Sequence, residues 1–289
     1  MQIYSPIHQI SYQALAQISV KRDDLIDPYI SGNKWRKLKY ILADVLANGK
    51  THLVTFGGAY SNHLVATAAC AARNQLKSTA FVRGEEVTNE MLVLCRLFGM
   101  QLIFVDRAQY RHKKLLFEQY FSEDQEAYFI DEGGACEAAV KGCAEVINEL
   151  SIPYDYIFCA AGTGTTAAGL LRGLNAAKLP TILHVIPVLK NGEFITKEIA
   201  AYENDVSKLQ LHLNYHFGGY AKTTPELVQF IKNFTASTGL LIDPVYTAKM
   251  FYAIYDLIEK NKLEKDARIL AIHTGGLMGI MGMKEKFFI

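Results

Sequence analysis

The sequence lacks the features that mark membrane, secreted and nucleic-acid-binding proteins. No segment approaches the roughly 18 consecutive apolar residues of a membrane-spanning helix. The N-terminal stretch MQIYSPIHQI has neither the basic start nor the apolar run of a signal peptide. The net charge is only +1, which gives no general attraction to nucleic acid or to an anionic membrane. We therefore expect a soluble protein without a nucleic-acid or membrane partner.

Cysteine is scarce as well. The chain has five cysteines, none of them in a CxxC pair: Cys70, Cys95, Cys136, Cys143 and Cys159. Their odd number and apolar neighbours predict reduced, mostly buried thiols and hence a cytoplasmic protein. Cys136 and Cys143 are too isolated from histidine to predict a zinc site, so we expect no metal.

Several common catalytic signatures are also missing. The chain has no HExxH motif, no visible Ser/His/Asp triad and no GxxxxGK[ST] nucleotide loop. Gly162-Thr163-Gly164 lacks the third glycine of a dinucleotide fingerprint, and no acidic residue follows about twenty positions later. These absences disfavour metalloproteases, serine hydrolases and nucleotide-binding enzymes.

What the sequence does have is an alternation of apolar strand-like runs with longer stretches of helical spacing. Glycines stand at several strand ends, which favours a mostly parallel sheet covered by helices, an α/β fold. The predicted strands are 51–58, 78–84, 101–106, 154–162, 181–188, 209–217 and 267–276. The predicted helices are 35–49, 61–74, 88–100, 136–150, 165–176, 225–234 and 246–261.

Positive charge is concentrated in ISGNKWRKLKY, residues 30–40. In a helix, Lys34 and Lys37 are three positions apart and share one face. Two neighbouring ammonium groups lower each other's pKa, and burial lowers it further, so one of them could attack a carbonyl carbon. The alternatives are a solvated basic helix start and an anion site, since cations oppose the helix dipole unless an anion is bound there.

Small residues follow an apolar strand in CAAGTGTTAAGLL, residues 159–171. A loop of this kind at a helix start offers converging N–H groups and hydroxyls to a phosphate. We predict a phosphomonoester site at Gly162–Thr166; a merely tight turn between strand and helix is the alternative.

A third polar cluster lies in FGGAYSNHLVATAA, residues 56–69. Two glycines end a strand there, and Ser61, Asn62 and His63 begin a helix. Ligands of doubly wound sheets bind beyond the carboxyl ends of strands, so this trio could hold a carboxylate and a ring oxygen. A plain helix cap is the alternative, especially for Ser61.

Two tyrosines stand beside further strand ends or helix starts. Tyr220 lies in HFGGYAKTTPE (216–226) and Tyr246 in DPVYTAKM (243–250). Either could act as an acid, a base or a stacking partner, although most tyrosines are structural. For His273, in IHTGGLMG (272–279), we predict a packed strand residue rather than a catalyst.

Together with KRDDL (21–25) and EGGACEAAVKGCAEV (132–146), these segments resemble the 1-aminocyclopropane-1-carboxylate (ACC) deaminase and D-cysteine desulfhydrase family of fold-type II, tryptophan synthase β-like, pyridoxal 5′-phosphate enzymes. The similarity covers nearly the whole chain, with seven motifs in order. It implies a two-domain, three-layer α/β/α fold with mostly parallel sheets. The implied large domain is discontinuous, 1–46 and 141–289, and the small domain is 47–140.

The resemblance also implies a role for each cluster. Lys34 would carry pyridoxal phosphate covalently and act as a catalytic residue together with Ser61, Tyr220 and Tyr246. The implied cofactor contacts beside Lys34 are Lys37 at the phosphate, Asn62 at the ring oxygen, Thr274 at the pyridine nitrogen, and Gly162, Thr163, Gly164, Thr165 and Thr166 as the phosphate cup. The implied substrate contacts are Ser61, Asn62, His63, Tyr220, Tyr246 and Thr247.

Two departures select one branch of the family. ACC deaminases carry Glu where this chain has Thr247 and Leu where it has Thr274; both positions resemble the D-cysteine desulfhydrases. A threonine hydroxyl does not keep the pyridine nitrogen protonated, which favours prompt β-elimination over long-lived carbanions. We therefore predict a lyase that converts a small amino acid such as D-cysteine to pyruvate, ammonia and sulfide. The resemblance, rather than these two residues, implies a homodimer. ACC deaminase and β-replacement are alternatives, as is a non-catalytic phosphate-ligand sensor.

Two further features leave the substrate open. The family commonly has Gln before the serine of its SN[QH] motif, where this chain has Tyr60. The chain is also shorter than typical members.

Overall fold

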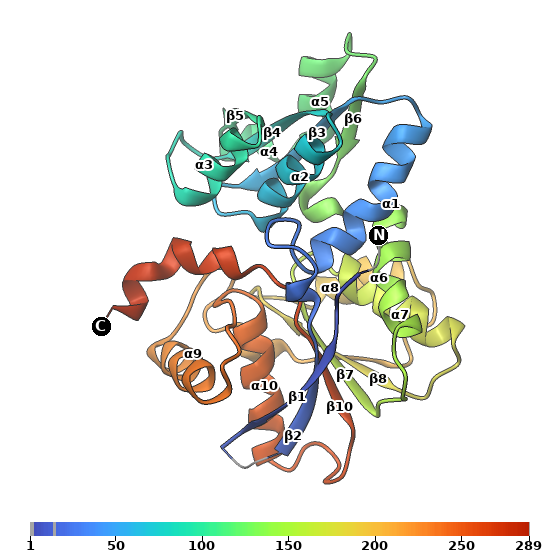
Figure 1. Ribbon diagram of the computed structural model, residues 1–289, viewed down its shortest axis with the longest axis vertical. Helices are drawn as coiled ribbons and strands as arrows, with labels where there is room; N and C mark the ends of the chain where they lie inside the picture. Colours follow the sequence, from blue (N-terminus) through green and yellow to red (C-terminus); the bar gives the residue numbers. More distant parts are fainter. Residues whose placement is uncertain (1–2, 14–15, 289) are drawn as a thin grey trace.

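The computed structural model describes residues 3–13 and 16–288, and Figure 1 shows two lobes, each built around a sheet. The sheet of the lower lobe has six strands in the order β1-β2-β10-β7-β8-β9. In that order their bounds are Ile7–Tyr12, Ala16–Lys21, Ile269–Ile272, Tyr156–Ala161, Ile182–Pro187 and Leu209–Leu211. Strand β1 runs antiparallel to β2, and the other pairings described in this sheet are parallel.

The sheet of the upper lobe has four strands in the order β5-β4-β3-β6, all paired in parallel. Their bounds in that order are Gln101–Val105, Lys77–Arg83, His52–Gly58 and Ala127–Ile130. Together the two sheets confirm the predicted α/β class with mostly parallel strands.

Helices cover both sheets. The α-helices are α1 (Asn33–Ala47), α2 (Asn62–Arg73), α3 (Glu90–Leu97), α4 (Arg107–Tyr110), α5 (Lys113–Phe121), α6 (Glu137–Asn148), α7 (Thr165–Ala176), α8 (Phe194–Ala200), α9 (Pro225–Thr238) and α10 (Thr247–Glu259). The 3-10 segments are η1 (Asp23–Leu25), η2 (Glu132–Gly134), η3 (Leu213–Tyr215) and η4 (Leu277–Phe287). No helix in the described ranges is long and apolar enough to cross a membrane.

The six-stranded sheet is buried on both faces, as its apolar strands predict. Because side chains alternate along a strand, Phe158 of β7 packs into one core with α9 and α10, whereas Ile157 packs into another with α6 and α7. Figure 1 shows these helix pairs on opposite sides of the sheet. The three-layer α/β/α arrangement is therefore confirmed.

The strands of the upper sheet fall between residues 52 and 130, inside the predicted small domain 47–140. The exact boundaries stay a prediction, and residues 1–2, 14–15 and 289 of the predicted large domain lie outside the described residues. Helix α1 joins the lobes, and the C-terminal η4 lies along the left of the boundary between them in Figure 1.

One predicted strand was too long, and strands β1, β2 and β6 were not predicted. The predicted strand 209–217 ends at Leu211, because His212 turns to stack on His184 of β8 and the chain then enters η3. The N-terminal hairpin of β1 and β2 was not predicted at all. Strand β1 lies at the sheet edge with mostly exposed or half-exposed side chains, so it has no apolar run to reveal it.

Candidate active site

A cavity of about 970 Å³ opens where the carboxyl ends of strands from both sheets meet. Gly58 at the end of β3, Gly162 just after β7 and Thr274 just after β10 all line it, as expected for an α/β fold. Of the predicted site residues, the cavity is lined by Lys34, Lys37, Ser61, Asn62, His63, Gly162, Thr163, Gly164, Thr166, Tyr220, Tyr246 and Thr274. Thr165 and Thr247 lie behind the lining.

The two lysines of α1 enter the cavity from one helix face. Lys34 is half-buried, and burial, followed by the nearby ammonium of Lys37, lowers its pKa to about 7. Lys37 is fully enclosed and donates to the Gly133 carbonyl oxygen at 2.9 Å; burial lowers its pKa too. At neutral pH a large fraction of Lys34 is therefore an unprotonated amine, which is the nucleophilic form.

Helix α1 is fixed by a buried ion-pair network. The guanidinium of Arg36 is fully buried and donates to Asp23 at 2.6 and 2.7 Å and to Glu149 at 2.7 and 2.9 Å. Lys21 pairs with Glu149 at 2.8 Å. Arg36 is therefore structural rather than solvated, and it stands between the two cavity lysines in sequence.

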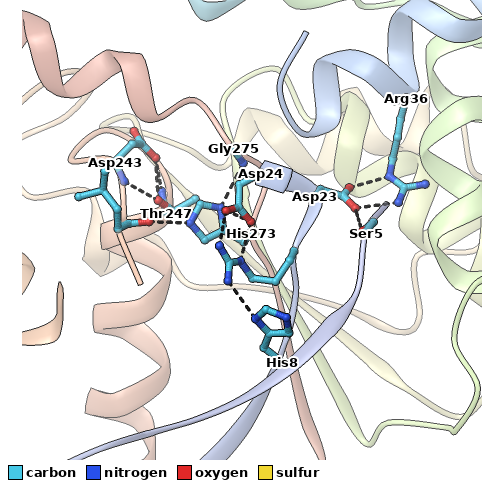
Figure 2. A network of polar contacts seen from close by, with 11 residues as sticks. Ser5, His8, Asp23, Asp24, Arg36, Asp243, Thr247, His273 and Gly275 are labelled. Atoms are coloured by element: carbon cyan, nitrogen blue, oxygen red, sulfur yellow. Dashed lines mark hydrogen bonds and ion pairs between the residues drawn. The ribbon is translucent and has the colours of Figure 1, made fainter. Parts of the chain in front are cut away.

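The two adjacent acids of KRDDL, Asp23 and Asp24, contact different parts of the structure. Figure 2 shows Asp23 pointing to Arg36 of α1 and Asp24 pointing the other way, to His273. The Nδ1 atom of His273 lies 3.5 Å from Asp24 and accepts from the Gly275 N–H at 3.3 Å, while its Nε2 bonds the Leu241 carbonyl at 2.8 Å. His273 is thus packed as predicted, although it lies one position beyond β10 rather than in the strand, and it fixes the turn that carries Thr274 into the cavity.

The predicted phosphate loop joins β7 to α7. Gly164 caps the helix in the left-handed conformation (φ 78°), which aims the first N–H groups of α7 at the cavity. The Thr163 and Thr165 hydroxyls lie 3.1 Å apart, and Thr166 accepts from the side-chain amide of Asn33 at 2.9 Å. The loop is therefore tied to the residue that precedes Lys34, and it offers N–H groups where an anion would bind.

Ser61 begins α2 without capping it by its side chain, so the simple capping alternative does not hold. Asn62 uses its amide nitrogen to donate to the Gly276 carbonyl at 3.2 Å. His63 is buried, and its Nε2 lies 2.8 Å from the Thr55 hydroxyl, while its Nδ1 has no hydrogen-bond partner in the described structure. Burial, then the charges of Lys34 and Lys37, hold the His63 pKa well below 6.5, so this ring is neutral.

The two tyrosines meet at the far side of the cavity. The Tyr246 hydroxyl donates to Tyr220 at 3.4 Å, and the rings stand edge to face at 6.1 Å. Burial raises the pKa of both phenols. Each phenol therefore keeps its proton at neutral pH and can donate a hydrogen bond.

A residue that the sequence reasoning missed, Asp243, explains where Thr247 lies. The buried Asp243 carboxylate accepts from the N–H groups of Val245, Tyr246 and Thr247 and from the Thr247 hydroxyl. Thr247 is fully buried by this bonding, so the predicted substrate contact from its side chain is not seen. The signal was present, since an acidic residue just before a helix is a common N-terminal cap.

No sequence pattern predicted that η4 would line the cavity, to which it contributes Gly282, Met283 and Lys286. A Cβ atom on Gly282 would lie 2.7 Å from the ring of Tyr60, so the two pack closely. Lys284 reaches across to Glu90 of α3 in the upper lobe. The described residues contain no cluster of acidic, histidine and cysteine side chains suited to a metal ion.

Comparison with known proteins gives a consistent result. A family model described as "Pyridoxal-phosphate dependent enzyme" matches residues 4–275. A protein of Pyrococcus horikoshii provisionally named 1-aminocyclopropane-1-carboxylate deaminase is 32% identical over 96% of this chain and 90% of its own. The bifunctional D-cysteine desulfhydrase/1-aminocyclopropane-1-carboxylate deaminase of Arabidopsis thaliana mitochondria is 28% identical over 96% of this chain and 77% of its own. A crystal structure of an ACC deaminase homologue superposes with a TM-score of 0.87, at 30% identity, over 98% of this chain and 93% of that one.

Proposed function

Because this chain belongs to the family of pyridoxal-phosphate dependent enzymes, we propose that it is a lyase that releases ammonia and a 2-oxo acid from a small amino acid. D-cysteine is the first-choice substrate. One observation carries the proposal: the Lys34 amine, which has a pKa of about 7, lines the cavity. The same cavity contains a helix start suited to an anion and two protonated phenols.

The residues present fit the cofactor. An aldehyde requires an unprotonated amine, which Lys34 supplies, and a phosphate requires N–H donors at a helix start, which the Gly162–Thr166 loop supplies. Lys37, one turn beyond Lys34, adds positive charge on the same side of the cavity. When bound, pyridoxal phosphate supplies the electron sink that stabilises negative charge at the substrate α-carbon.

The side chains of the cavity can be given the remaining tasks. Ser61 and Asn62 hold the substrate carboxylate at the start of α2, where the helix dipole favours an anion. The amine of Lys34 takes the α-proton, because a base with a pKa near the working pH is effective in both of its protonation states.

The leaving group departs on the tyrosine side. The C–S bond breaks with its electron pair on sulfur, which leaves as hydrosulfide while it accepts a hydrogen bond from a phenol of the Tyr246–Tyr220 pair. The proton that Lys34 removed from the α-carbon is then released and balances hydrosulfide as hydrogen sulfide. The aminoacrylate that is released reacts with water to give pyruvate and ammonia. The overall reaction converts D-cysteine and water to pyruvate, ammonia and hydrogen sulfide.

Thr274 is the observation that favours elimination. It lines the cavity and carries a hydroxyl rather than a carboxylate, which suits a weaker electron sink and prompt loss of a leaving group. Thr247 does not add support for elimination through a substrate contact, because its hydroxyl donates to Asp243. ACC deamination therefore stays as the second candidate. The name of the Pyrococcus relative favours it, whereas the name of the Arabidopsis relative includes both activities.

A product assay separates the two reactions. The purified protein is offered D- and L-amino acids and ACC, and 2-oxo acid release is measured. Pyruvate with sulfide from D-cysteine supports the first reaction, and 2-oxobutyrate from ACC at a higher rate reverses the order. The absence of any 2-oxo acid would contradict the proposed function and favour a phosphate-ligand sensor.

The attachment point is tested by mass spectrometry after borohydride reduction. The cofactor's mass should be on Lys34 in the wild type and in Lys39→Ala, a neighbouring lysine of α1 that pairs with Glu145 outside the cavity lining. It should be absent from Lys34→Ala. A label on Lys37 would contradict the assignment.

We also propose a cytoplasmic homodimer. The cytoplasmic location is supported by the free, largely buried cysteines, and the dimer by the family resemblance alone. Light scattering of the purified protein tests the dimer: a mass near the 32.3 kDa of one chain would contradict it.

A further inference from the structure

Another lysine, Lys249, lies in the first turn of α10 and is fully inaccessible to solvent. Its ammonium donates to three backbone carbonyl oxygens: His216 at 2.8 Å, Gly219 at 2.8 Å and Val188 at 3.2 Å. It makes no ion pair within the described residues. Burying a cation without a hydrogen-bonded counter-ion is unfavourable, so the three carbonyl contacts, helped by the nearby charge of Asp243, stabilise the ammonium inside the protein.

Two of those carbonyls belong to a loop whose backbone conformation is strained. Between His216 and Lys222 the backbone has positive φ at Phe217 (49°), Gly218 (94°), Gly219 (114°) and Ala221 (52°). The left-handed conformation is unfavourable for a residue with a side chain, and the loop contains two such residues, Phe217 and Ala221. Contacts from outside the loop must therefore keep it in this conformation.

Lys249 supplies those contacts at both ends of the turn. The His216 carbonyl already accepts the Gly219 N–H at 3.0 Å, and the Gly219 carbonyl accepts the Lys222 N–H at 3.1 Å. The ammonium therefore binds the second lone pair of each oxygen. The third contact, to Val188, joins the loop to the segment that follows β8.

The loop matters because Tyr220 follows Gly219 directly. The Tyr220 hydroxyl meets that of Tyr246, which lies three residues before Lys249 on the same helix start. A single ammonium thus connects the backbone that carries one phenol to the helix that carries the other.

We propose that Lys249 is a positioning residue, which holds Tyr220 against Tyr246 by binding the carbonyl oxygens of His216 and Gly219. It thereby sets the geometry of the hydrogen-bond donor to the leaving group. This inference rests on the proposed function, because that function places Tyr220 at the reacting end of the substrate.

A double-mutant cycle on the holoenzyme tests the inference. Lys249→Met keeps the length of the side chain and removes the ammonium, and it should lower kcat for 2-oxo acid release by about tenfold while KM stays within about threefold. If Lys249 acts through Tyr220, adding Lys249→Met to Tyr220→Phe should lower kcat by less than about twofold. If the fold loss of kcat in the double variant equals the product of the losses in the two single variants, the proposal is overturned.

Hydrogen–deuterium exchange gives a readout that does not depend on turnover. The amides of residues 217–222 should exchange at least about tenfold faster in Lys249→Met holoenzyme without substrate. Lys50→Met is the matched control, since Lys50 also donates to a backbone carbonyl, that of Gln125, but lies outside the cavity lining. Unchanged exchange in Lys249→Met would overturn the proposal, even if the wild type turned over no amino acid and the proposed function had failed.

A second variant reaches the same loop if Lys249→Met does not fold. Gly219→Ala places a side chain at φ 114°, which L residues rarely adopt, and it leaves the lysine in place. It should show the same loss of kcat and the same masking by Tyr220→Phe. Wild-type kcat in Gly219→Ala, or a loss that Tyr220→Phe does not mask, would overturn the proposal.

Discussion

Replacing Lys34 by Met should stabilise the cofactor-free protein at neutral pH. In the folded chain the Lys34 pKa is lowered from 10.5 to about 7, first by burial and then by Lys37. Between these two pH values the unfolded chain binds more protons, so wild-type stability rises with pH across that range. At about 1.4 kcal/mol per tenfold change, the Lys34 charge opposes folding by about 5 kcal/mol well below pH 7, about 4 at pH 7 and about 2 at pH 9.

Lys34→Met removes this unfavourable charge. The gain in the free energy of unfolding over wild type should therefore be greatest at or below pH 7 and should decrease towards pH 10.5. The value of about 4 kcal/mol at pH 7 is an upper limit, because the amine borders the cavity and a buried charge is partly relieved by local relaxation. Urea unfolding of the apoprotein at pH 7 and pH 9 measures the difference. Lys39→Met is the control, since Lys39 forms a surface pair with Glu145 worth about 0–1 kcal/mol. A Lys34→Met protein no more stable than wild type at pH 7, or equally favoured at both pH values, would refute the reasoning.

Three further variants test the rest of the site. Arg36→Met leaves the buried Asp23 carboxylate unpaired and should lower the free energy of unfolding by about 3–5 kcal/mol in urea; a loss below about 1 kcal/mol would contradict the network. Tyr246→Phe should lower kcat about 100-fold with the visible absorbance of the cofactor retained, and undiminished kcat would show that the Tyr246–Tyr220 pair does not stabilise the leaving group. Gly164→Ala must adopt φ 78° at a cost of about 1–2 kcal/mol. It should therefore weaken cofactor binding about tenfold in a fluorescence titration of apoprotein; unchanged binding would show that the loop is not the phosphate site.

Much of the fold could be predicted because its signals are local. The helix predicted at 165–176 is found as Thr165–Ala176, where a glycine-rich turn separates an apolar strand from a helical repeat. Helical spacing likewise places Lys34 and Lys37 on one face, and both line the cavity. These features depend on residues within a few positions of one another, so no knowledge of the tertiary structure was needed.

The remaining features depend on partners far apart in the chain. Asn62 meets Gly276 across 214 positions, and Arg36 meets Glu149 across 113. The charge of Arg36 gave no indication of whether it is solvated or buried, because only the folded chain brings the two acids to it. The same holds for Lys249, whose three acceptors are backbone oxygens and therefore leave no trace in the amino-acid sequence.

The contacts of the buried lysines explain why Lys34, rather than Lys37, is suited to be the nucleophile. Lys249 donates to three carbonyls and Lys37 to one at 2.9 Å, so their protons are held in place. The Lys34 ammonium also has one hydrogen bond in the described structure, but a longer one, to the side-chain oxygen of Asn33 at 3.3 Å. A cation with so little compensation is the one that loses its proton most readily, and the resulting amine faces the open cavity. Helical spacing treats the two α1 lysines alike, and the difference arises only when the Gly133 carbonyl reaches Lys37.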